Sequence, residues 1–152
     1  MALLIRRAVL ADAPVIAEFN RLLAQESEGK TLDPLALARG VAACLADPVK
    51  GVYYLAEEAG AAQGQVALTY EFSDWRDGWF WWIQSVYVRK EARRQGVFRA
   101  LYDHIHRSAC ADPTVIGLRL YVEKENAVAK RTYRQLGMEE SGYELLERWP
   151  LR

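Results

Sequence analysis

The sequence has few of the residues that build metal sites, redox centres or disulfide frameworks. Its 152 residues include only two cysteines and two histidines. Cys44 and Cys110 show neither a CxxC spacing nor a metal-ligand pattern. We therefore expect free thiols, buried or half-buried, in a reducing cytoplasm, and no bound metal.

Long hydrophobic runs and an excess of charge of one sign are also missing. No apolar run reaches the ~20 residues that span a bilayer, so we expect no membrane association. The first charges follow a short apolar stretch, which is the reverse of a secretory signal. Lys plus Arg and Asp plus Glu each total 20, and the net charge of zero argues against a nucleic-acid partner.

The composition is that of an ordinary globular domain, with 51% hydrophobic and 26% charged residues. No repeat, low-complexity tract or Pro/Gly/Ser-rich linker divides the chain. We therefore expect a single domain over residues 1–152.

Hydrophobic periodicity and helix-capping residues predict strands alternating with helices. Asp12 with Pro14, and Asp33 with Pro34, have the pattern of helix starts. The helices are expected over about residues 12–25, 33–45, 96–109 and 126–136. The strands are expected up to residue 9 and over residues 52–57, 65–72, 79–88, 115–122 and 143–149. This order predicts an α/β domain built around one sheet.

Basic residues gather in one segment that runs from a strand into a helix. Residues 89–107 contain six basic side chains against two acidic ones, a local excess that favours a small anion. The first N–H groups of a helix lack intrahelical partners, so those of residues 95–99, with Gly96 among them, would hold a diphosphate. Arg93 and Arg94 would add charge. The alternative is a solvated basic turn that only begins a helix, since neither a P-loop nor a GxGxxG fingerprint is present.

Two segments carry a family resemblance. Arg93-Arg94-Gln95-Gly96-Val97-Phe98 resembles the Q/R-x-x-G-x-G/A loop of the GNAT N-acetyltransferase superfamily, although Phe98 replaces a small residue. Asn126, Ala129 and Tyr133, followed by Leu136-Gly137, are similar to the family's N…A…Y helix and its ending. The resemblance is strong over about residues 65–142. It implies a GNAT-like fold, with a single mixed, mostly antiparallel sheet flanked by helices.

The resemblance also implies an acyltransferase that moves an acetyl group from acetyl-CoA, its co-substrate, to an amine. A free amine would attack the thioester directly, backbone N–H groups of the fourth strand would polarise the carbonyl, and Tyr133 would protonate the leaving thiolate. Tyr133 follows Asn126 by two helical turns, so both face one side. Taken alone, Tyr133 is better explained as an interior aromatic of an amphipathic helix, and its register after Asn126 favours the catalytic role. The residues implied in cofactor binding are Val86, Tyr87, Val88, Arg93, Arg94, Gln95, Gly96, Val97, Phe98, Arg99, Asn126 and Ala129.

The acceptor is expected to be the amine of a small molecule or an amino-acid derivative. A protein N-terminus or lysine is the alternative, and a non-catalytic acyl-CoA sensor is a different class. Gln84 aligns with a glutamate of the family's diamine acetyltransferases and cannot act as that base. The general base stays open among Glu26, Glu28, Glu71, Asp74 and Asp77. The candidates for substrate binding are Glu28, Glu71, Trp75, Trp82 and Gln84.

Aromatic residues are concentrated in one expected hairpin, residues 65–88. Strand alternation places Phe80, Trp82, Gln84, Val86 and Val88 on one face, and Trp79, Trp81, Ile83, Ser85 and Tyr87 on the other. Most of these rings are expected in the core or a dimer contact, with a substrate wall or a protein-interaction surface as alternatives. Because a 152-residue monomer does not easily bury a strand that is aromatic on both faces, we expect a homodimer.

Overall fold

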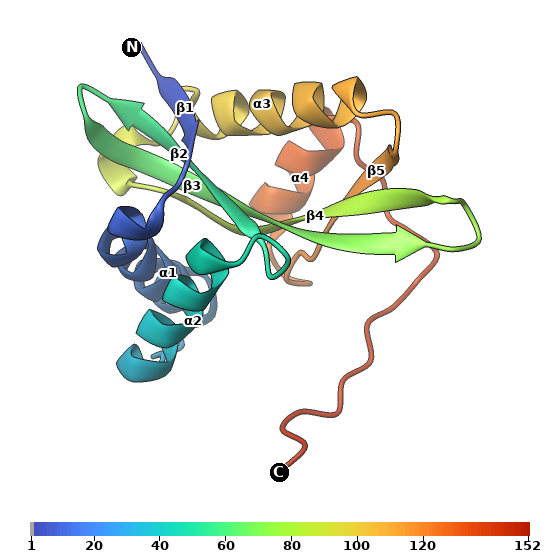
Figure 1. Ribbon diagram of the computed structural model, residues 1–152, viewed down its shortest axis with the longest axis horizontal. Helices are drawn as coiled ribbons and strands as arrows, with labels where there is room; N and C mark the ends of the chain where they lie inside the picture. Colours follow the sequence, from blue (N-terminus) through green and yellow to red (C-terminus); the bar gives the residue numbers. More distant parts are fainter. Residues whose placement is uncertain (1) are drawn as a thin grey trace. The chain divides into compact units, whose positions relative to one another are not determined.

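A five-stranded sheet organises the first of two compact units of the chain, Met1–Leu120; the second unit is Tyr121–Arg152. The computed structural model describes residues 2–152. In sheet order the strands are β1 (Leu4–Arg7), β2 (Val52–Glu58), β3 (Ala61–Ser73), β4 (Gly78–Val88) and β5 (Val115–Leu120) (Figure 1). Neighbouring strands are antiparallel except β4 and β5, which are parallel. The expected mixed, mostly antiparallel sheet is confirmed.

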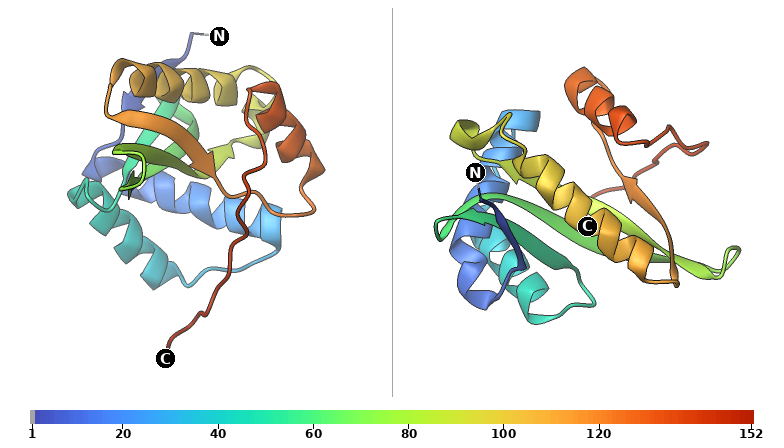
Figure 2. Two further views of the ribbon diagram at one scale, coloured as in Figure 1. Left: turned by 90° about the vertical axis from the view of Figure 1, so that its right-hand side faces the viewer. Right: turned by 90° about the horizontal axis from the view of Figure 1, so that it is seen from above.

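Helices cover both faces of the sheet in this first unit. The helices α1 (Ala13–Glu28) and α2 (Pro34–Ala46) lie on one face, and α3 (Val97–Ala111) lies on the other (Figures 1 and 2). The α1/α2 face buries Ile16, Val41, Tyr53, Leu55 and Ala67. The α3 face buries Leu68 of β3 together with Val97, Leu101 and Ile105, which recur every four residues along the helix. Each face thus has its own core, and the sheet separates the two.

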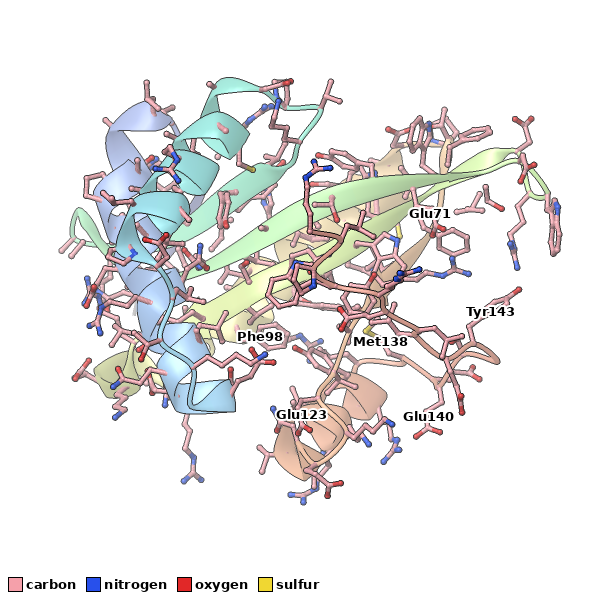
Figure 3. The ribbon with its side chains drawn as sticks, turned by 90° about the horizontal axis from the view of Figure 1, so that it is seen from below. Glu71, Phe98, Glu123, Met138, Glu140 and Tyr143 are labelled. Atoms are coloured by element: carbon pink, nitrogen blue, oxygen red, sulfur yellow. The ribbon has the colours of Figure 1, made fainter. Side chains whose placement is uncertain are left out.

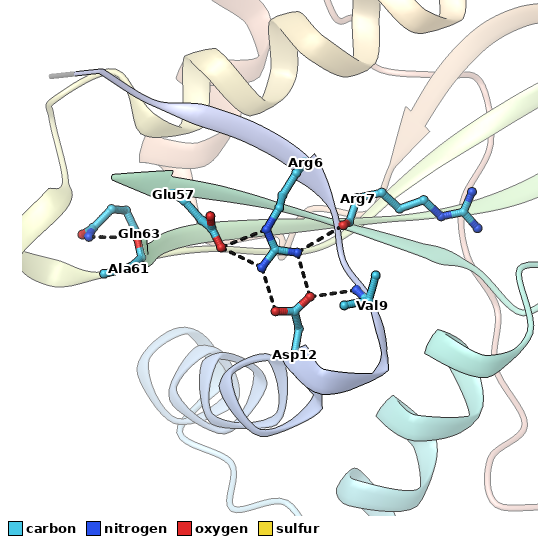
Figure 4. Close-up of polar contacts among 7 residues, drawn as sticks. All are labelled: Arg6, Arg7, Val9, Asp12, Glu57, Ala61 and Gln63. Carbon is cyan, nitrogen blue, oxygen red and sulfur yellow. Dashed lines mark hydrogen bonds and ion pairs between the residues drawn. The ribbon is translucent and has the colours of Figure 1, made fainter. Parts of the chain in front are cut away.

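Arg6 joins β1 to the start of α1 and to β2 (Figure 4). Its guanidinium forms two hydrogen bonds of 2.8 Å to the Asp12 carboxylate and further bonds of 2.6 and 2.9 Å to Glu57. Asp12 precedes α1, but its side chain does not cap that helix: it accepts from Arg6 and from the Val9 N–H. The Asp12 side chain, which the sequence pattern predicts as a helix cap, therefore binds Arg6 instead. Asp33 does cap α2, accepting from the Leu35 N–H at 3.0 Å.

A β-bulge in β4 overturns the simple alternation expected for this strand. The pairs Ala67–Gln84 and Gln65–Tyr87 enclose one residue of β3 but two of β4, so one residue of β4 is extra. Ser85, at this point, has a left-handed φ of 51°. Residues paired across antiparallel strands share a face, so Tyr87 lies on the same face as Gln84, not on the opposite one. The sequence carries no glycine here that would have indicated the bulge.

The second unit contains a single regular element among its residues 121–152, the helix α4 (Ala127–Gln135). Asn126 caps it as expected, accepting from the Ala129 N–H at 3.1 Å. The strand expected over residues 143–149 is wrong, because this segment has no regular secondary structure. Its aromatic and apolar residues favour a strand, but a strand needs a neighbour for its backbone groups, and residues 121–152 hold no other strand.

Two smaller expectations can be compared with the structure. Cys44 is half-buried and Cys110 is exposed, so the expected burial holds only for Cys44. Within residues 2–152, every helix is too short or too polar to cross a membrane.

Candidate functional site

Both ladders of β4 are interrupted within the same few residues. Toward β3, the bulge at Ser85 leaves one residue without a ladder partner. Toward β5, the register ends at the pair Ile83–Leu120, although β4 continues to Val88. Backbone N–H and C=O groups that are removed from water require hydrogen-bond partners. The last residues of β4 therefore offer backbone groups that can pair with an extended ligand.

The N-terminus of α3 follows this stretch closely along the chain. The first intrahelical bond of α3 runs from the Ala100 N–H to the Gly96 carbonyl at 2.9 Å. The N–H groups of residues 97–99 consequently have no partner inside the helix. Gly96 has a φ of 83°, and a Cβ added there would meet no described atom within 4 Å. The positive end of the helix dipole and these N–H groups make this turn suited to a phosphate.

The two arginines of the preceding loop have different roles. Arg93 donates from Nε to the Val88 carbonyl and from Nη2 to Glu26, both at 2.9 Å. It therefore ties the loop to β4 and to the end of α1. Arg94 has a left-handed φ of 63° and makes no side-chain hydrogen bond or ion pair with the residues that the structure describes. Arg94 is the arginine whose charge is available to an anion.

Glu26 and Tyr87 form a partly buried hydrogen-bonded pair beside this loop. The Tyr87 hydroxyl donates to Glu26 at 2.7 Å, and its ring packs on Phe19 at a centroid distance of 5.2 Å. Burial and the Glu26 hydrogen bond raise the pKa of Tyr87 to about 12. The Tyr87 hydrogen bond and the Arg93 guanidinium hold the pKa of Glu26 below its usual range. Both side chains are engaged structurally, so the backbone of Tyr87, not its phenol, faces any ligand of β4.

Other residues of the basic loop and helix are also engaged. Val97 is buried in the α3 core, and the Gln95 amide donates to the Glu91 carbonyl at 2.9 Å. Arg99 pairs with Asp103 one turn along the exposed side of α3, at 2.9 Å. The Phe98 ring lies 6.2 Å from that of Tyr102 on the same helix (Figure 3). Phe98 thus extends along α3, and its N–H stays part of the helix N-terminus.

Beyond the bulge, the α1/α2 face of the sheet carries a polar and aromatic cluster. Glu71 of β3 accepts from Trp82 Nε1 at 3.1 Å and from Arg119 Nη1 at 2.8 Å (Figure 3). The Arg119 guanidinium lies 3.6 Å from the centroid of Phe80. Gln84 donates to the Thr69 hydroxyl at 3.3 Å. Since Arg119 offsets the charge of Glu71, this surface is not a simple anionic site for a cation.

Trp75 lies away from this cluster, and Glu28 has an ion pair of its own. Trp75 is in the β3–β4 turn and is 84% exposed. The turn with Trp75 precedes Gly78, the first residue of β4. Gln84 lies six residues further along this strand, which at about 3.3 Å per residue is roughly 20 Å from the turn. Glu28 ends α1 and lies 3.8 Å from Lys30. The structure therefore brings together Glu71, Trp82 and Gln84, but not Trp75 with them.

The remaining expected site residues belong to the second unit. Asn126 and Ala129 form the first turn of α4, and Tyr133 lies two turns from Asn126. Tyr133 is half-buried, and burial raises the pKa of its hydroxyl. The phenol is therefore protonated at neutral pH, as a proton donor must be.

Sequence reasoning missed several polar residues of the first unit. Gln65 is fully buried, and its Nε2 donates to Asn20 at 2.9 Å and to the Ser85 carbonyl at 3.0 Å. A glutamine at the start of the apolar run Val66-Ala67-Leu68 is a signal that could have indicated a buried polar contact. Arg119, inside an apolar strand, is a similar signal.

Comparison with known proteins assigns the family. The sequence model of the acetyltransferase (GNAT) family matches residues 17–138. The chain belongs to this family. No match was found among curated proteins.

Solved structures agree with the assignment. A possible acetyltransferase from Clostridium difficile 630 is 45% identical, with a TM-score of 0.94 and 100% of both chains covered. A predicted acetyltransferase with acetyl-CoA from Clostridium acetobutylicum shares the fold at 18% identity and a TM-score of 0.79, covering 97% of this chain and 96% of the other. A ribosomal-protein-alanine N-acetyltransferase from Brucella melitensis also shares it, at 18% identity and a TM-score of 0.80, covering 97% and 99%. This GNAT protein is thus an acyltransferase with the fold of its family. Proteins of this family bind acetyl-CoA.

Proposed function

We propose that this GNAT enzyme transfers the acetyl group of acetyl-CoA to the amine of a small molecule or an amino-acid derivative. The observation that carries the proposal is the coincidence of the two ladder interruptions in β4 with a helix N-terminus just downstream. An extended pantetheine needs backbone partners, and a diphosphate needs N–H groups and positive charge. Unit 1 provides both in chain order, at residues 84–88 and 94–99.

In the proposed reaction the amine attacks the thioester carbonyl directly. A backbone N–H between Val86 and Val88 stabilises the oxyanion. The attacking nitrogen gives its proton to the general base or to water, and the C–S bond breaks to give the amide and the coenzyme A thiolate. Tyr133 gives its proton to that thiolate as general acid. The Asn126–Ala129 turn of α4 would contact the cofactor. One GNAT domain over residues 1–152 is part of the proposal, supported by a family match that runs across both units.

The acceptor is proposed to bind at the polar and aromatic cluster of Glu71, Trp82 and Gln84. These side chains share one face of the sheet with the bulge, and they supply an aromatic wall with hydrogen-bonding groups. A protein N-terminus or lysine as acceptor, and a non-catalytic acyl-CoA sensor, are the competing functions. The paired state of Glu71 and the glutamine at position 84 leave the general base open.

A homodimer is also part of the proposal. On the α3 face of the sheet, Tyr70, Phe72, Trp79 and Trp81 form an aromatic ladder, with edge-to-face pairs at 6.1 and 5.2 Å. Three of the four rings, Tyr70, Phe72 and Trp79, remain 37–48% exposed. Exposed aromatic surface of this kind marks an interface, and a second copy would cover it.

The test is calorimetry with acetyl-CoA followed by thiol release with a panel of amines and alcohols. The expected result is acetyl-CoA binding and release of thiol only with amines. Turnover of alcohols without any amine would contradict the proposed acceptor. Tight acetyl-CoA binding without turnover of small amines, peptides or lysine side chains would favour the sensor.

A further inference from the structure

A buried polar chain crosses from α1 to the bulge of β4. The Asn20 amide donates to the Tyr53 hydroxyl at 3.0 Å, and Asn20 Oδ1 accepts from Gln65 Nε2 at 2.9 Å. The same Gln65 nitrogen donates to the Ser85 carbonyl at 3.0 Å. This series of hydrogen bonds thus begins in the core under α1 and ends at Ser85, the one residue of β4 with a left-handed φ.

The two halves of the Gln65 amide are used unequally. Its side chain is fully buried, and its nitrogen has two acceptors. Its oxygen has no hydrogen-bond partner among the described residues. An unsatisfied buried acceptor lowers stability, and an apolar side chain would avoid that cost. We therefore attribute the presence of a glutamine at position 65 to its amide nitrogen, which donates to the Ser85 carbonyl.

Ser85 needs such support. A non-glycine residue with a left-handed φ is strained, and here the strain lies in the interior of a strand. The bulge at this point places Gln84 and Tyr87 on one face and leaves backbone groups outside the β3 ladder. Without the Gln65 bond, the Ser85 carbonyl loses its anchor, and we expect the backbone of residues 83–88 to open more often.

We propose that Gln65 is a positioning residue for acetyl transfer: its amide holds the Ser85 carbonyl and thereby keeps the β4 bulge that presents backbone groups to the thioester. This inference rests on the proposed function for the identity of the ligand. The anchoring of the bulge itself can be measured without any ligand. Asn20 orients the Gln65 amide through its own hydrogen bond to it, and Tyr53 in turn holds Asn20.

The primary variant is Gln65→Met, which keeps the length of the side chain and removes both donors. Tyr53→Phe removes only the far end of the chain. Leu68→Val is the matched control, because Leu68 is buried in the same strand on the opposite face. All three variants are compared with the wild type by thermal unfolding, by deuterium uptake of a peptide spanning residues 83–88, by acetyl-CoA titration and by steady-state kinetics.

The expected result separates positioning from stability. Gln65→Met should lose thermal stability to an extent comparable to Leu68→Val, because Asn20 Oδ1 and the Ser85 carbonyl lose their donor. Of these two variants, it alone should exchange faster by about ten-fold over residues 83–88, which is the effect of losing the one hydrogen bond to the Ser85 carbonyl. Its kcat should fall at least as much, with a smaller change in the KM of the amine. Tyr53→Phe should show the same pattern more weakly. Leu68→Val should lose thermal stability and keep its kcat and its uptake over residues 83–88.

Three outcomes would decide against parts of the inference. Wild-type uptake over residues 83–88 in Gln65→Met overturns the anchoring. Faster uptake with wild-type kcat and acetyl-CoA affinity overturns the positioning role and makes Gln65 purely structural. If the wild type itself binds no acetyl-CoA, the proposed function fails, whereas faster uptake in Gln65→Met still supports the anchoring.

Discussion

Arg93 donates a hydrogen bond of 2.9 Å to Glu26 and so fastens the loop before α3 to the last turns of α1. The same guanidinium lies over the Tyr87 ring at 5.5 Å. An arginine neutralised by a carboxylate contributes little further charge to a ligand. The positive charge that the sequence places in this loop is therefore divided between a structural arginine and Arg94.

This division predicts unequal effects for the two arginines. Arg94→Met should weaken acetyl-CoA binding about ten-fold, because it removes a charge near the diphosphate, and the loss should shrink at high salt. Arg93→Met should lower the unfolding temperature more than Arg94→Met does. Calorimetry at two salt concentrations and thermal unfolding check both effects. Equal losses of affinity in the two variants would contradict the division.

Gly96 provides a second test of the diphosphate site. Gly96→Asp should abolish measurable acetyl-CoA binding, because the carboxylate would lie among the N–H groups that receive the phosphates. Gly60→Asp is a matched control. Gly60 has a φ of 79°, against 83° for Gly96, and a Cβ at either position meets no described atom within 4 Å. The backbone cost should be alike, so only a difference in affinity reports on the ligand. Equal affinity in the two variants would remove the assignment.

The proposed homodimer is tested at the aromatic ladder. Phe72→Asp should yield a monomeric mass by light scattering at micromolar concentrations, because a buried unpaired carboxylate is costly in an interface. Trp75→Asp, in the exposed β3–β4 turn, should leave the mass of the dimer unchanged. A wild type that is monomeric throughout this range would refute the dimer.

The fold was largely predictable from local patterns. Asp33-Pro34 begins a helix, and the apolar residues of α3 recur every four positions, so those elements formed where the sequence indicated. Local patterns could not predict pairing. Residues 143–149 have the aromatic and apolar content of a strand, but their unit holds no other strand for pairing. Asp12 has the chemistry of a cap but is bound by Arg6 of β1.

The candidate site was predictable only where its chemistry is local. The Gly96 turn and the start of α3 follow from a short segment. The bulge at Ser85 does not, because it depends on the distant Gln65, twenty positions earlier. Arg119 and Glu71 are likewise 48 residues apart, so their pairing, and the neutral charge of the proposed acceptor face, needed the tertiary structure.

The Arg6–Asp12 pair predicts a pH-dependent stability. The Arg6 hydrogen bonds hold the pKa of Asp12 below its usual range. A folded pKa below the unfolded value stabilises the protein above the unfolded value of about 3.9, and that contribution is lost as pH falls through the folded pKa. Asp12→Asn should therefore cost about 1–2 kcal/mol at pH 7. The difference between variant and wild type should shrink below about pH 4. Chemical denaturation at several pH values checks this, and a gap constant down to pH 3 would contradict it.

Tyr133 gives the test of the proposed chemistry. Tyr133→Phe keeps the ring and removes the proton donor, so the acetyl-CoA dissociation constant and the unfolding temperature should change little. Loss of a general acid typically costs on the order of 10² to 10⁴ in rate, and this loss should be seen in kcat. Because burial raises the pKa of Tyr133, the phenol is protonated at neutral pH, and its ionisation should not lower kcat there. Water could protonate the thiolate in part and reduce the loss. Single-turnover measurements show whether chemistry limits kcat. If it does, and Tyr133→Phe retains full activity at neutral pH, then Tyr133 only packs in the interior, and the proton comes from another group.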